Sequence, residues 1–481
     1  MMKINCTQQL PKKITTLILP FQKGAIDDTK IAEFSGIKSP IDFTGKFKEK
    51  VLLYHPEKAL KIYLLGLGTQ KEMAKCSDAF RSLAFHQQKN WSKQVVIDLS
   101  NLPVATAYHA ALGCQLATYA IGTFKQTKTT EATLTSSTLK LVHTNKKAKN
   151  LAAEGLQTAN TQIEMIKLVN SPANEKTPRF IANYAIQSGK ANGFSVKVLG
   201  EKALKKEGLH TVLAVGNGSQ HESVLIKMEY KPENISKKTP TLGLVGKGIT
   251  FDTGGLSIKG ATNMHYMKSD MGGAAAVLGA IELAAKLQLN IHVVCLIPSA
   301  ENAVDAKSVK PGDVIHSYSG KTIEIIDTDA EGRLILADGL AYIQKNYQPD
   351  IVLDVATLTG STVRTLGYAA GGLFTQNEAL AADLMAVGQA THERLWPFPL
   401  WDDYASDITS DIADVRNFSG RPINGAIAAG KFLEFFIKDH PQWAHLDIAG
   451  VAFGDSEYSK MKSATGYGVR LLVEYMKRLI K

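Results

Sequence analysis

Short apolar runs and longer helix-like stretches alternate along the chain. The apolar runs have the length and the β-branched content of buried strands, and they lie at residues 59–65, 94–99, 212–215, 225–230, 241–245, 291–297, 323–326 and 351–355. The stretches that predict helices lie at residues 105–120, 151–169 and 272–289. Strands separated by helices predict an α/β fold with a mostly parallel or mixed central sheet that is flanked by helices.

Two prolines interrupt this pattern at a point that predicts a domain boundary. Pro172 and Pro178 lie in a polar passage at residues 170–178, where no regular element can continue. A chain of 481 residues is also long for a single core. We expect a small N-terminal α/β domain for assembly or shielding, a linker helix and turn, and a larger catalytic domain. Their predicted bounds are residues 1–150, 151–178 and 179–481.

The composition is that of a globular protein in a reducing compartment. Hydrophobic residues make up 44% of the chain and charged residues 21%, and no apolar run approaches the roughly 20 residues that span a bilayer. The four cysteines are far apart and form no C-x-x-C pair, which favours reduced thiols over a disulfide framework. We therefore expect a cytoplasmic protein with no membrane association.

The excess of basic residues does not by itself predict a nucleic-acid partner. Lysine and arginine number 55 against 45 acidic residues, for a formal net charge of +10. The lysines are scattered, and no basic stripe carries interleaved aromatic residues, so solubility explains most of the charge. A binding or regulatory protein, for example on DNA, stays open as an alternative that a salt-dependent gel shift would test.

The strongest chemical signal lies where predicted strands end. Residues 327–334 read DTDAEGRL and place three carboxylates and one guanidinium just beyond an apolar run. Residues 245–259 add two lysines and an aspartate after another run, and residues 267–273 add a further acid. Because ligand sites gather at the carboxyl ends of parallel strands, we expect these loops to converge.

Four of these acids have the charge that two divalent cations require. Asp252, Asp270, Asp329 and Glu331 supply four negative charges, and without cations they would repel one another and their pKa values would rise. Lys247 lies between two glycines and would become a ligand after losing its proton. Taken alone it would be a solvated turn lysine. Beside this cluster, we interpret it as a ligand.

Three charged side chains remain that are not among these proposed metal ligands. Lys259 and Arg333 would suit an anionic intermediate or a small bound anion, although either would ordinarily be a plain ion-pair partner. Asp327 would give the cluster an extra negative charge, and we expect its side chain to cap the turn instead. Another two-metal hydrolase, such as a phosphoesterase, stays open as an alternative, although few basic groups are present to hold a phosphate dianion.

The motifs together resemble the leucyl aminopeptidase family, the cytosol aminopeptidases, which are dinuclear metallo-exopeptidases. The family signature is usually N-T-D-A-E-G-R-L, and here Asp327 stands in place of the asparagine. The resemblance runs from VNSPAN at residues 169–174 to GYGVR at residues 466–470, which is about the last 310 residues. The first 150 residues resemble the family only in general character.

The resemblance implies a role for each charged residue. Two divalent ions, Mn²⁺ or Zn²⁺, would be bound in each subunit. The tighter ion would be held by Lys247, Asp252, Asp270 and Glu331. The more exchangeable ion would be held by Asp252, Asp329 and Glu331. Lys259 would steady the scissile carbonyl oxygen, and Arg333 would seat a bicarbonate that acts as the base. The backbone of Ala330, Gly332 and Leu358 would help to bind that bicarbonate.

The resemblance also implies a substrate and an assembly. The enzyme would release N-terminal, preferably apolar and Leu-like, residues from short peptides, through attack of a metal-bound water on the scissile carbonyl. The pocket for the first side chain would be lined by Met267, Thr357, Gly360 and Ala449. Ala452 lies where some relatives have a larger residue. The family fold implies a homohexamer whose sites face an interior cavity.

Overall fold

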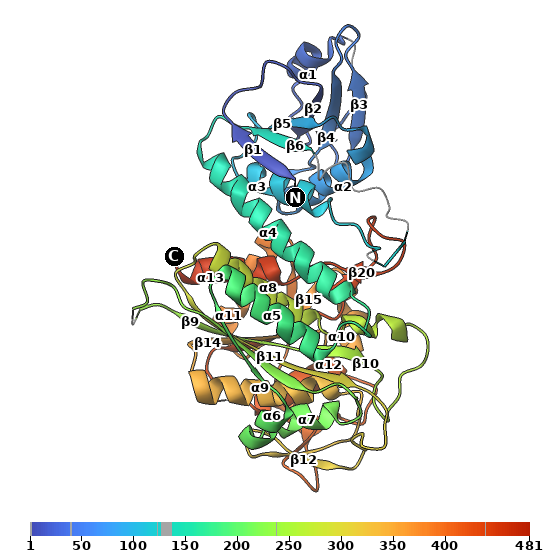
Figure 1. The fold of residues 1–481 in the computed structure, drawn as a ribbon, viewed down its shortest axis with the longest axis vertical. Helices are drawn as coiled ribbons and strands as arrows, with labels where there is room; N and C mark the ends of the chain where they lie inside the picture. Colours follow the sequence, from blue (N-terminus) through green and yellow to red (C-terminus); the bar gives the residue numbers. More distant parts are fainter. Residues whose placement is uncertain (1, 39–40, 123, 127–136, 237, 438) are drawn as a thin grey trace. The chain divides into compact units, whose positions relative to one another are not determined.

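The computed structural model describes residues 2–38, 41–122, 124–126, 137–236, 238–437 and 439–481. The chain divides into two compact α/β units, as the sequence predicts. The first, called here the N-terminal unit, comprises Met1–Ile163 with Glu457–Lys460, and the second, called here the C-terminal unit, comprises Glu164–Ser456 with Met461–Lys481. Each unit is built around its own sheet (Figure 1).

The N-terminal unit contains a six-stranded sheet with strand order β1-β6-β5-β2-β4-β3. All neighbours are parallel except β3 and β4. The strands are β1 Lys3–Thr7, β2 Thr16–Phe21, β3 Lys50–Tyr54, β4 Lys61–Gly66, β5 Gln94–Asp98 and β6 Thr138–Val142. The helices are α1 Asp28–Ser35, α2 Cys76–Gln87, α3 Thr106–Leu116 and the start of α4 Lys147–Asn170, with short 3-10 turns at Gln70–Lys75 and Gln88–Asn90. The predicted strands at 59–65 and 94–99 and the predicted helix at 105–120 are therefore confirmed within a few residues.

The C-terminal unit is built on a nine-stranded mixed sheet. Its order is β16-β15-β18-β14-β9-β11-β8-β7, and β10 also pairs with β11. The central neighbours β18, β14, β9 and β11 are parallel, whereas β8 runs antiparallel to β11. The strands are β7 Ser195–Leu199, β8 Val224–Tyr230, β9 Thr241–Gly246, β10 Gly248–Asp252, β11 His292–Asn302, β14 Ile351–Ala356, β15 Gly371–Phe374, β16 Leu395–Phe398 and β18 Trp443–Asp447. The predicted strands at 225–230, 241–245, 291–297 and 351–355 belong to this sheet.

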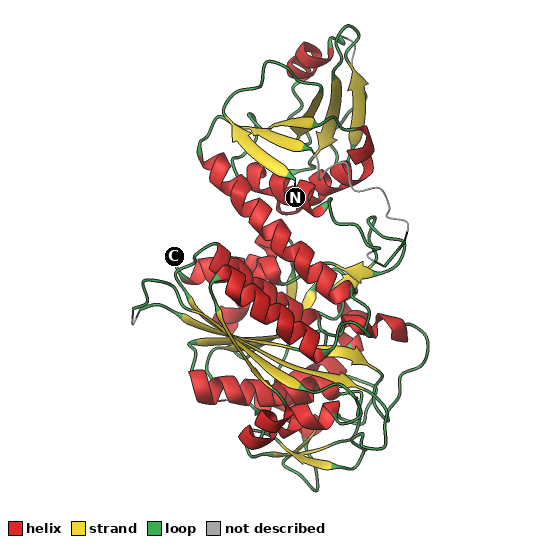
Figure 2. Cartoon of the chain, in the orientation of Figure 1, coloured by secondary structure: helices red, strands yellow, loops and turns green. Residues whose placement is uncertain are grey.

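Helices cover both faces of the large sheet (Figure 2). Helices α8 and α13 pack together on one face, and α7 and α9 pack together on the other. The helices of this unit are α5 Pro178–Asn192, α6 Glu201–Glu207, α7 His210–Gly216, α8 Gly272–Lys286, α9 Glu331–Tyr347, α10 Gly360–Leu366, α11 Glu378–Thr391, α12 Gly425–Phe435 and α13 Val469–Leu479. Two 3-10 helices are η4 Met264–Ser269 and η5 Asp402–Ile408. Apolar side chains such as Val245, Leu296 and Leu340 fill the layer between α9 and the sheet.

Small accessory sheets complete the C-terminal unit. One consists of β12 Val314–His316, β13 Thr322–Glu324 and β17 Val415–Arg416, and the other pairs β19 Phe453–Gly454 with β20 Ser463–Ala464. The predicted strand at 323–326 therefore belongs to a small sheet and is shorter than expected. The acidic loop that follows it still leads directly into α9.

The predicted strand at residues 212–215 is wrong, because this segment is the helix α7. A run of four apolar residues has no periodicity that separates a strand from a buried helix. Helix α7 is favoured by a partner that is distant in the sequence. Asp338 on α9 accepts hydrogen bonds from the backbone N–H groups of Thr211 and Val212, in the first turn of α7. Thr211 Oγ1 also donates to the carbonyl of Leu334. Nothing in the local sequence carries that information.

Neither a membrane-spanning helix nor a disulfide contributes to the part of the chain that is described. No helix in those residues is both long and apolar enough to cross a bilayer. All four cysteines are free, and Cys76, Cys114 and Cys295 are buried. Burial raises the pKa of each of these three thiols, so they pack as small apolar groups.

Replacing Asp338 tests the account of α7. Asp338 is fully buried and also accepts from the backbone N–H of Tyr318 at 2.7 Å. Asp338→Ala would leave these buried donors without an acceptor and should lower the free energy of unfolding by about 3 kcal/mol. Asp338→Asn retains one acceptor oxygen and should fall between wild type and Asp338→Ala. Equal denaturant midpoints for all three proteins would contradict this explanation of the helix.

Candidate functional site

Five charged side chains converge at the carboxyl-terminal edge of the parallel strands in the C-terminal unit. Lys247 lies between β9 and β10, and Asp252 is the last residue of β10. Asp270 follows η4 and precedes α8, while Asp329 and Glu331 belong to the turn and first residue that open α9. The structure therefore brings together all five residues that the resemblance gives as metal ligands.

The distances show how closely these groups are packed. Oxygens of Asp252, Asp329 and Glu331 lie within 4.8 Å of one another. Lys247 Nζ lies 2.8 Å from Asp270 Oδ2 and 2.9 Å from Glu331 Oε1. It also donates to the carbonyl of Thr357 at 3.0 Å.

Lys259 approaches the same acids from the loop that follows β10. Its Nζ lies 2.7 Å from Asp252 Oδ2 and also contacts Asp329 Oδ1. Its side chain keeps 23% of its surface exposed, whereas the Lys247 side chain keeps 3%. One lysine is thus enclosed by the acids, and the other lies at the rim of the cluster and faces solvent.

Crowding and burial shift the pKa values in opposing directions. Burial raises the pKa of Asp252 and Asp270, and like-charged neighbours raise both further, against Lys259 and Lys247 at Asp252 and against Lys247 at Asp270. Burial, with the charge of Asp252, raises the pKa of Asp329 to about 7. At Glu331 burial also acts to raise the pKa. The positive charges of Lys247 and Lys259 outweigh burial there, so the pKa of this carboxyl is lowered. The acids are therefore held together against their mutual repulsion.

The donor set fits divalent cations. Asp270 Oδ2 and both carboxylate oxygens of Glu331 are buried and accept no hydrogen bond from the described residues. Lys247 Nζ lies at ion-pair distance from two of these oxygens, Asp270 Oδ2 and Glu331 Oε1. Buried carboxylate oxygens with unused lone pairs are costly unless they bind a cation. Carboxylates with one amine suit two Mn²⁺ or Zn²⁺ ions.

Lys247 requires a change of protonation to join such a set. Burial disfavours its ammonium, but the charges of Asp270 and Glu331 outweigh burial and raise its pKa. An amine binds a cation only as the neutral base, and a dication nearby favours that base. The acids that hold the ammonium here would then be shared with the cations.

Glycine at position 332 permits the close approach of Lys247. A Cβ at this position would lie 2.5 Å from Lys247 Cε and 2.6 Å from its Nζ. Both distances are well inside van der Waals contact, and the enclosed lysine has no room to move aside. The glycine in the DTDAEGRL motif is therefore required by packing.

Asn302 holds the acid-bearing loops in register, and no motif in the sequence identifies it. Its side-chain Nδ2 donates to Asp252 Oδ1 at 2.8 Å and to the carbonyl of Thr328 at 3.1 Å. Asn302 is buried at the end of β11. Its place at the carboxyl end of a central strand was the only available hint.

Asp327 caps its turn, as predicted. Its Oδ1 accepts a hydrogen bond of 2.8 Å from the backbone N–H of Asp329. Asn417 fixes the same turn from outside, because its Oδ1 accepts from Ile326 N at 2.8 Å and its Nδ2 donates to the Asp327 carbonyl at 2.6 Å. The side chain of Asp327 is therefore used in local structure.

Arg333 lies beside the acids and is nearly enclosed. It is 6% exposed, and its Nη1 donates to the carbonyl of Asn417 at 2.8 Å. Its Nε is buried and has no hydrogen-bond partner among the described residues. Burial, against the nearby acids, lowers its pKa to about 10, so the guanidinium stays charged at neutral pH.

The backbone groups assigned to an anion beside Arg333 have different surroundings. Ala330 and Gly332 lie at the start of α9, where the helix dipole favours an anion. The N–H of Ala330 already donates to the carbonyl of Asp327 at 3.3 Å. The N–H of Leu358 donates to Asp447 Oδ1 at 3.0 Å. An anion would therefore have to share that last donor with a carboxylate.

Asp447 organises the loops that carry the proposed substrate pocket. It is fully buried at the end of β18 and accepts hydrogen bonds from the loops that follow β14 and β18. The donors are Leu358 N, Thr359 N and Oγ1, Thr362 Oγ1 and Ala449 N. Asp447 is not among the predicted site residues, although an acid at the end of a central strand is a usable signal.

The four residues assigned to the first side-chain pocket come from three segments, namely η4 and the stretches that follow β14 and β18. Met267 lies on η4, Gly360 is the first residue of α10, and Ala449 follows β18. Thr357 Oγ1 donates to Asp270 Oδ1 at 2.8 Å, which ties the pocket to the acid cluster. Ala452 lies nearby, since a Cβ on Gly272 would be 3.0 Å from both the Ala452 and the Thr357 side chains.

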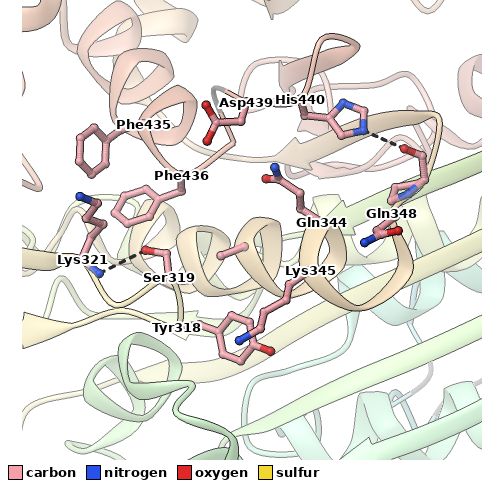
Figure 3. Close-up of a pocket in the computed structure, with 12 residues that line it drawn as sticks. Tyr318, Ser319, Lys321, Gln344, Lys345, Gln348, Phe435, Phe436, Asp439 and His440 are labelled. Carbon is pink, nitrogen blue, oxygen red and sulfur yellow. Dashed lines mark hydrogen bonds between the residues drawn. The ribbon is translucent and has the colours of Figure 1, made fainter.

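A separate cavity of about 610 Å³ lies away from the acids (Figure 3). It is bounded by Tyr318, Lys345 and Phe436, at the end of α9 opposite to Glu331. At a rise of about 1.5 Å per residue, those two ends of the helix are about 20 Å apart. None of the predicted site residues lines it, so we do not assign the chemistry to this cavity.

Comparison with known proteins gives matches along nearly the whole chain. The model of the cytosol aminopeptidase family, catalytic domain, matches residues 165–473, and that of its N-terminal domain matches residues 24–128. A probable cytosol aminopeptidase of Chlorobium limicola is 40% identical over 505 residues, which cover 99% of this chain and 100% of that relative. A probable cytosol aminopeptidase of Rickettsia felis is 38% identical and covers 92% of this chain and 91% of its own length.

Solved structures also match this chain over nearly its whole length. The bottromycin maturation enzyme BotP in complex with Mn has a TM-score of 0.84 and 29% identity to this chain, covering 98% of this chain and 100% of its own. A second structure of BotP has a TM-score of 0.81 and 30% identity, covering 97% of this chain and 99% of its own. The fold described above is therefore shared with an enzyme of known structure.

Asp327→Asn tests whether the extra acid serves only the turn. Asparagine offers the same acceptor oxygen to Asp329 N, so turnover should stay within about threefold of wild type and metal content should not change. Metal content is measured by elemental analysis after dialysis. A marked loss or gain of bound metal would show that the Asp327 charge acts on the site.

Gly332→Ala tests the close approach of Lys247. The added methyl group would displace the lysine by a substantial fraction of an ångström, and turnover should fall about 100-fold. Gly425→Ala is the matched control, because a Cβ there meets its nearest neighbour, Ser361, at an ordinary 3.6 Å. Wild-type turnover in Gly332→Ala would mean that the lysine is not tightly enclosed.

Proposed function

The chain belongs to the cytosol aminopeptidase family, and from this membership we propose that it releases apolar, Leu-like residues from the N-termini of short peptides. The family consists of metal-dependent exopeptidases that act on peptide substrates. The observation that carries the proposal is the cluster of Asp252, Asp329 and Glu331 oxygens within 4.8 Å of one another, with Lys247 and Asp270 adjoining it.

Two divalent cations, Mn²⁺ or Zn²⁺, would be held by the five ligand residues. Lys247, Asp252, Asp270 and Glu331 would hold one ion, and Asp252, Asp329 and Glu331 the other. When bound, the pair supplies Lewis-acid polarisation of the scissile carbonyl and acidifies a water molecule. The buried oxygens of Asp270 and Glu331 that accept no hydrogen bond from the described residues support this assignment.

Lys259 is the group of this chain that would act directly on the substrate. Its ammonium lies at the rim of the acid cluster, and the charges of Asp252 and Glu331 outweigh burial and raise its pKa, so it stays protonated. A protonated lysine at this place would donate to the carbonyl oxygen and stabilise the negative charge that develops there.

Arg333 would bind bicarbonate, which would accept the proton of the attacking water. The buried Nε of Arg333, which has no hydrogen-bond partner among the described residues, and the positive end of the α9 dipole support a small anion there. Leu358 would contribute only by sharing the N–H that it donates to Asp447. The arginine would therefore hold and orient the base.

Met267, Thr357, Gly360 and Ala449 would receive the first side chain of the peptide. The free N-terminal amine would bind one of the cations, which favours exopeptidase cleavage over cleavage within a chain. We further propose a homohexamer located in the cytoplasm, on the strength of the family resemblance and of the reduced cysteines.

A paired assay tests the reaction type. With added Mn²⁺ or Zn²⁺ the protein should hydrolyse Leu-p-nitroanilide and leave p-nitrophenyl phosphate intact, and exhaustive chelation should abolish the activity. Cleavage of the phosphate ester alone would make the protein a phosphoesterase. Full peptidase activity after chelation would contradict the proposal that the reaction depends on a bound metal.

Lys259→Met tests the role of the rim lysine. Loss of a donor to the developing oxyanion should lower kcat about 10²-fold to 10³-fold and leave KM within about threefold. Lys190→Met, at an exposed position of α5, is the control. A large rise in KM with unchanged kcat would place Lys259 in substrate binding instead.

A further inference from the structure

Lys176 is a buried lysine that the proposed mechanism does not use. It lies in the turn between α4 and α5, and it is 0% exposed. Its Nζ donates to the carbonyl of Val169 at 2.8 Å and to the carbonyl of Lys268 at 2.5 Å. Among the described residues, no carboxylate lies at ion-pair distance from it. A lysine buried against two carbonyls is costly to maintain, because its charge has lost both water and a counter-ion.

The two hydrogen bonds do not depend on the charge of Lys176. Burial, with the nearby Lys268, lowers its pKa to about 7. A neutral amine still has two N–H groups, which match the two carbonyl acceptors. The contacts to Val169 and Lys268 therefore persist in either protonation state.

The segment held by Lys176 carries two residues of the proposed site. Lys268 lies in η4, one residue after Met267 and two residues before Asp270. Lys268 Nζ donates in return to the carbonyl of Asn170 at 3.1 Å. Two lysines thus cross-link η4 and the end of α4 in opposite directions.

Helix η4 has few internal features that stabilise it. It is a 3-10 helix of six residues, none of them buried, and its N-cap side chain makes no capping hydrogen bond. Short 3-10 helices have poor hydrogen-bond geometry and depend on tertiary contacts. Tyr266 contacts the ring of Phe453, and η4 also packs against β10, while the two lysines add polar cross-links from the end of α4 and the turn after it.

We propose that Lys176 and Lys268 form a positioning pair that fixes η4, so that Met267 defines the substrate pocket and Asp270 meets the metal. This inference rests on the proposed aminopeptidase function for the role of Met267. The pair touches neither substrate nor metal. The pair acts through the backbone of η4, which positions Met267 and Asp270. Selectivity for the first residue of the peptide therefore depends on Lys176, in a turn about a hundred positions earlier in the chain.

Lys176→Met removes both donors and keeps the volume. The expected results are an affinity for Mn²⁺, measured by calorimetry on metal-free protein, that is about tenfold weaker than that of wild type, and a ratio of kcat/KM for Leu- and Phe-p-nitroanilide that changes at least about threefold. Lys176→Gln, which keeps an NH₂ donor, should recover part of both. Lys190→Met is the control and should match wild type.

Lys268→Met keeps the test decisive if Lys176→Met does not fold. It removes only the reciprocal bond at a half-buried position, and it should shift the Leu to Phe ratio in the same direction. Wild-type Mn²⁺ affinity and an unchanged ratio in the folded variants would overturn the positioning role. A wild-type protein that cleaves neither anilide would instead overturn the proposed function, while the Mn²⁺ affinities would still decide the effect on Asp270.

Discussion

Four carboxylates that must share one small volume are the constraint on which the C-terminal unit depends. Asp252, Asp270 and Glu331 are almost fully buried, and Asp329 lies at their edge. Their mutual repulsion is strong in such surroundings, because the effective dielectric constant is low. Two lysines offset part of it here, and two dications would offset it more completely. Charge neutralisation therefore connects the fold, the choice of ligands and the reaction.

The fold meets this constraint by bringing loops together from separate strands and fixing each one with polar contacts. Asn302 joins the loops of Asp252 and Thr328, while Asp447 gathers the loops that carry the substrate pocket. Lys176 holds the segment before Asp270. Such supporting contacts determine whether a ligand set is positioned well enough to act.

The charged residues and most central strands could be predicted from the sequence, because both follow local patterns. Four of the five ligand candidates stand in recognisable motifs at or just beyond strands, and strand ends converge in a parallel sheet. The helix α7 could not be predicted, because its cap, Asp338, lies more than a hundred residues away. For the same reason Asn302, Asp447 and Lys176 had no evident role in the sequence: each acts through hydrogen bonds to residues far along the chain.

The most direct measurement is an anomalous difference map from a crystal soaked in Mn²⁺. The account predicts two peaks, each about 2.0–2.2 Å from oxygens of Asp252 and Glu331. One should also contact Lys247 Nζ and Asp270, and the other Asp329. A single peak that Asp252 and Glu331 do not share would contradict the account. So would Lys247 that stays an ammonium ion-paired to Asp270 when the metal is at full occupancy.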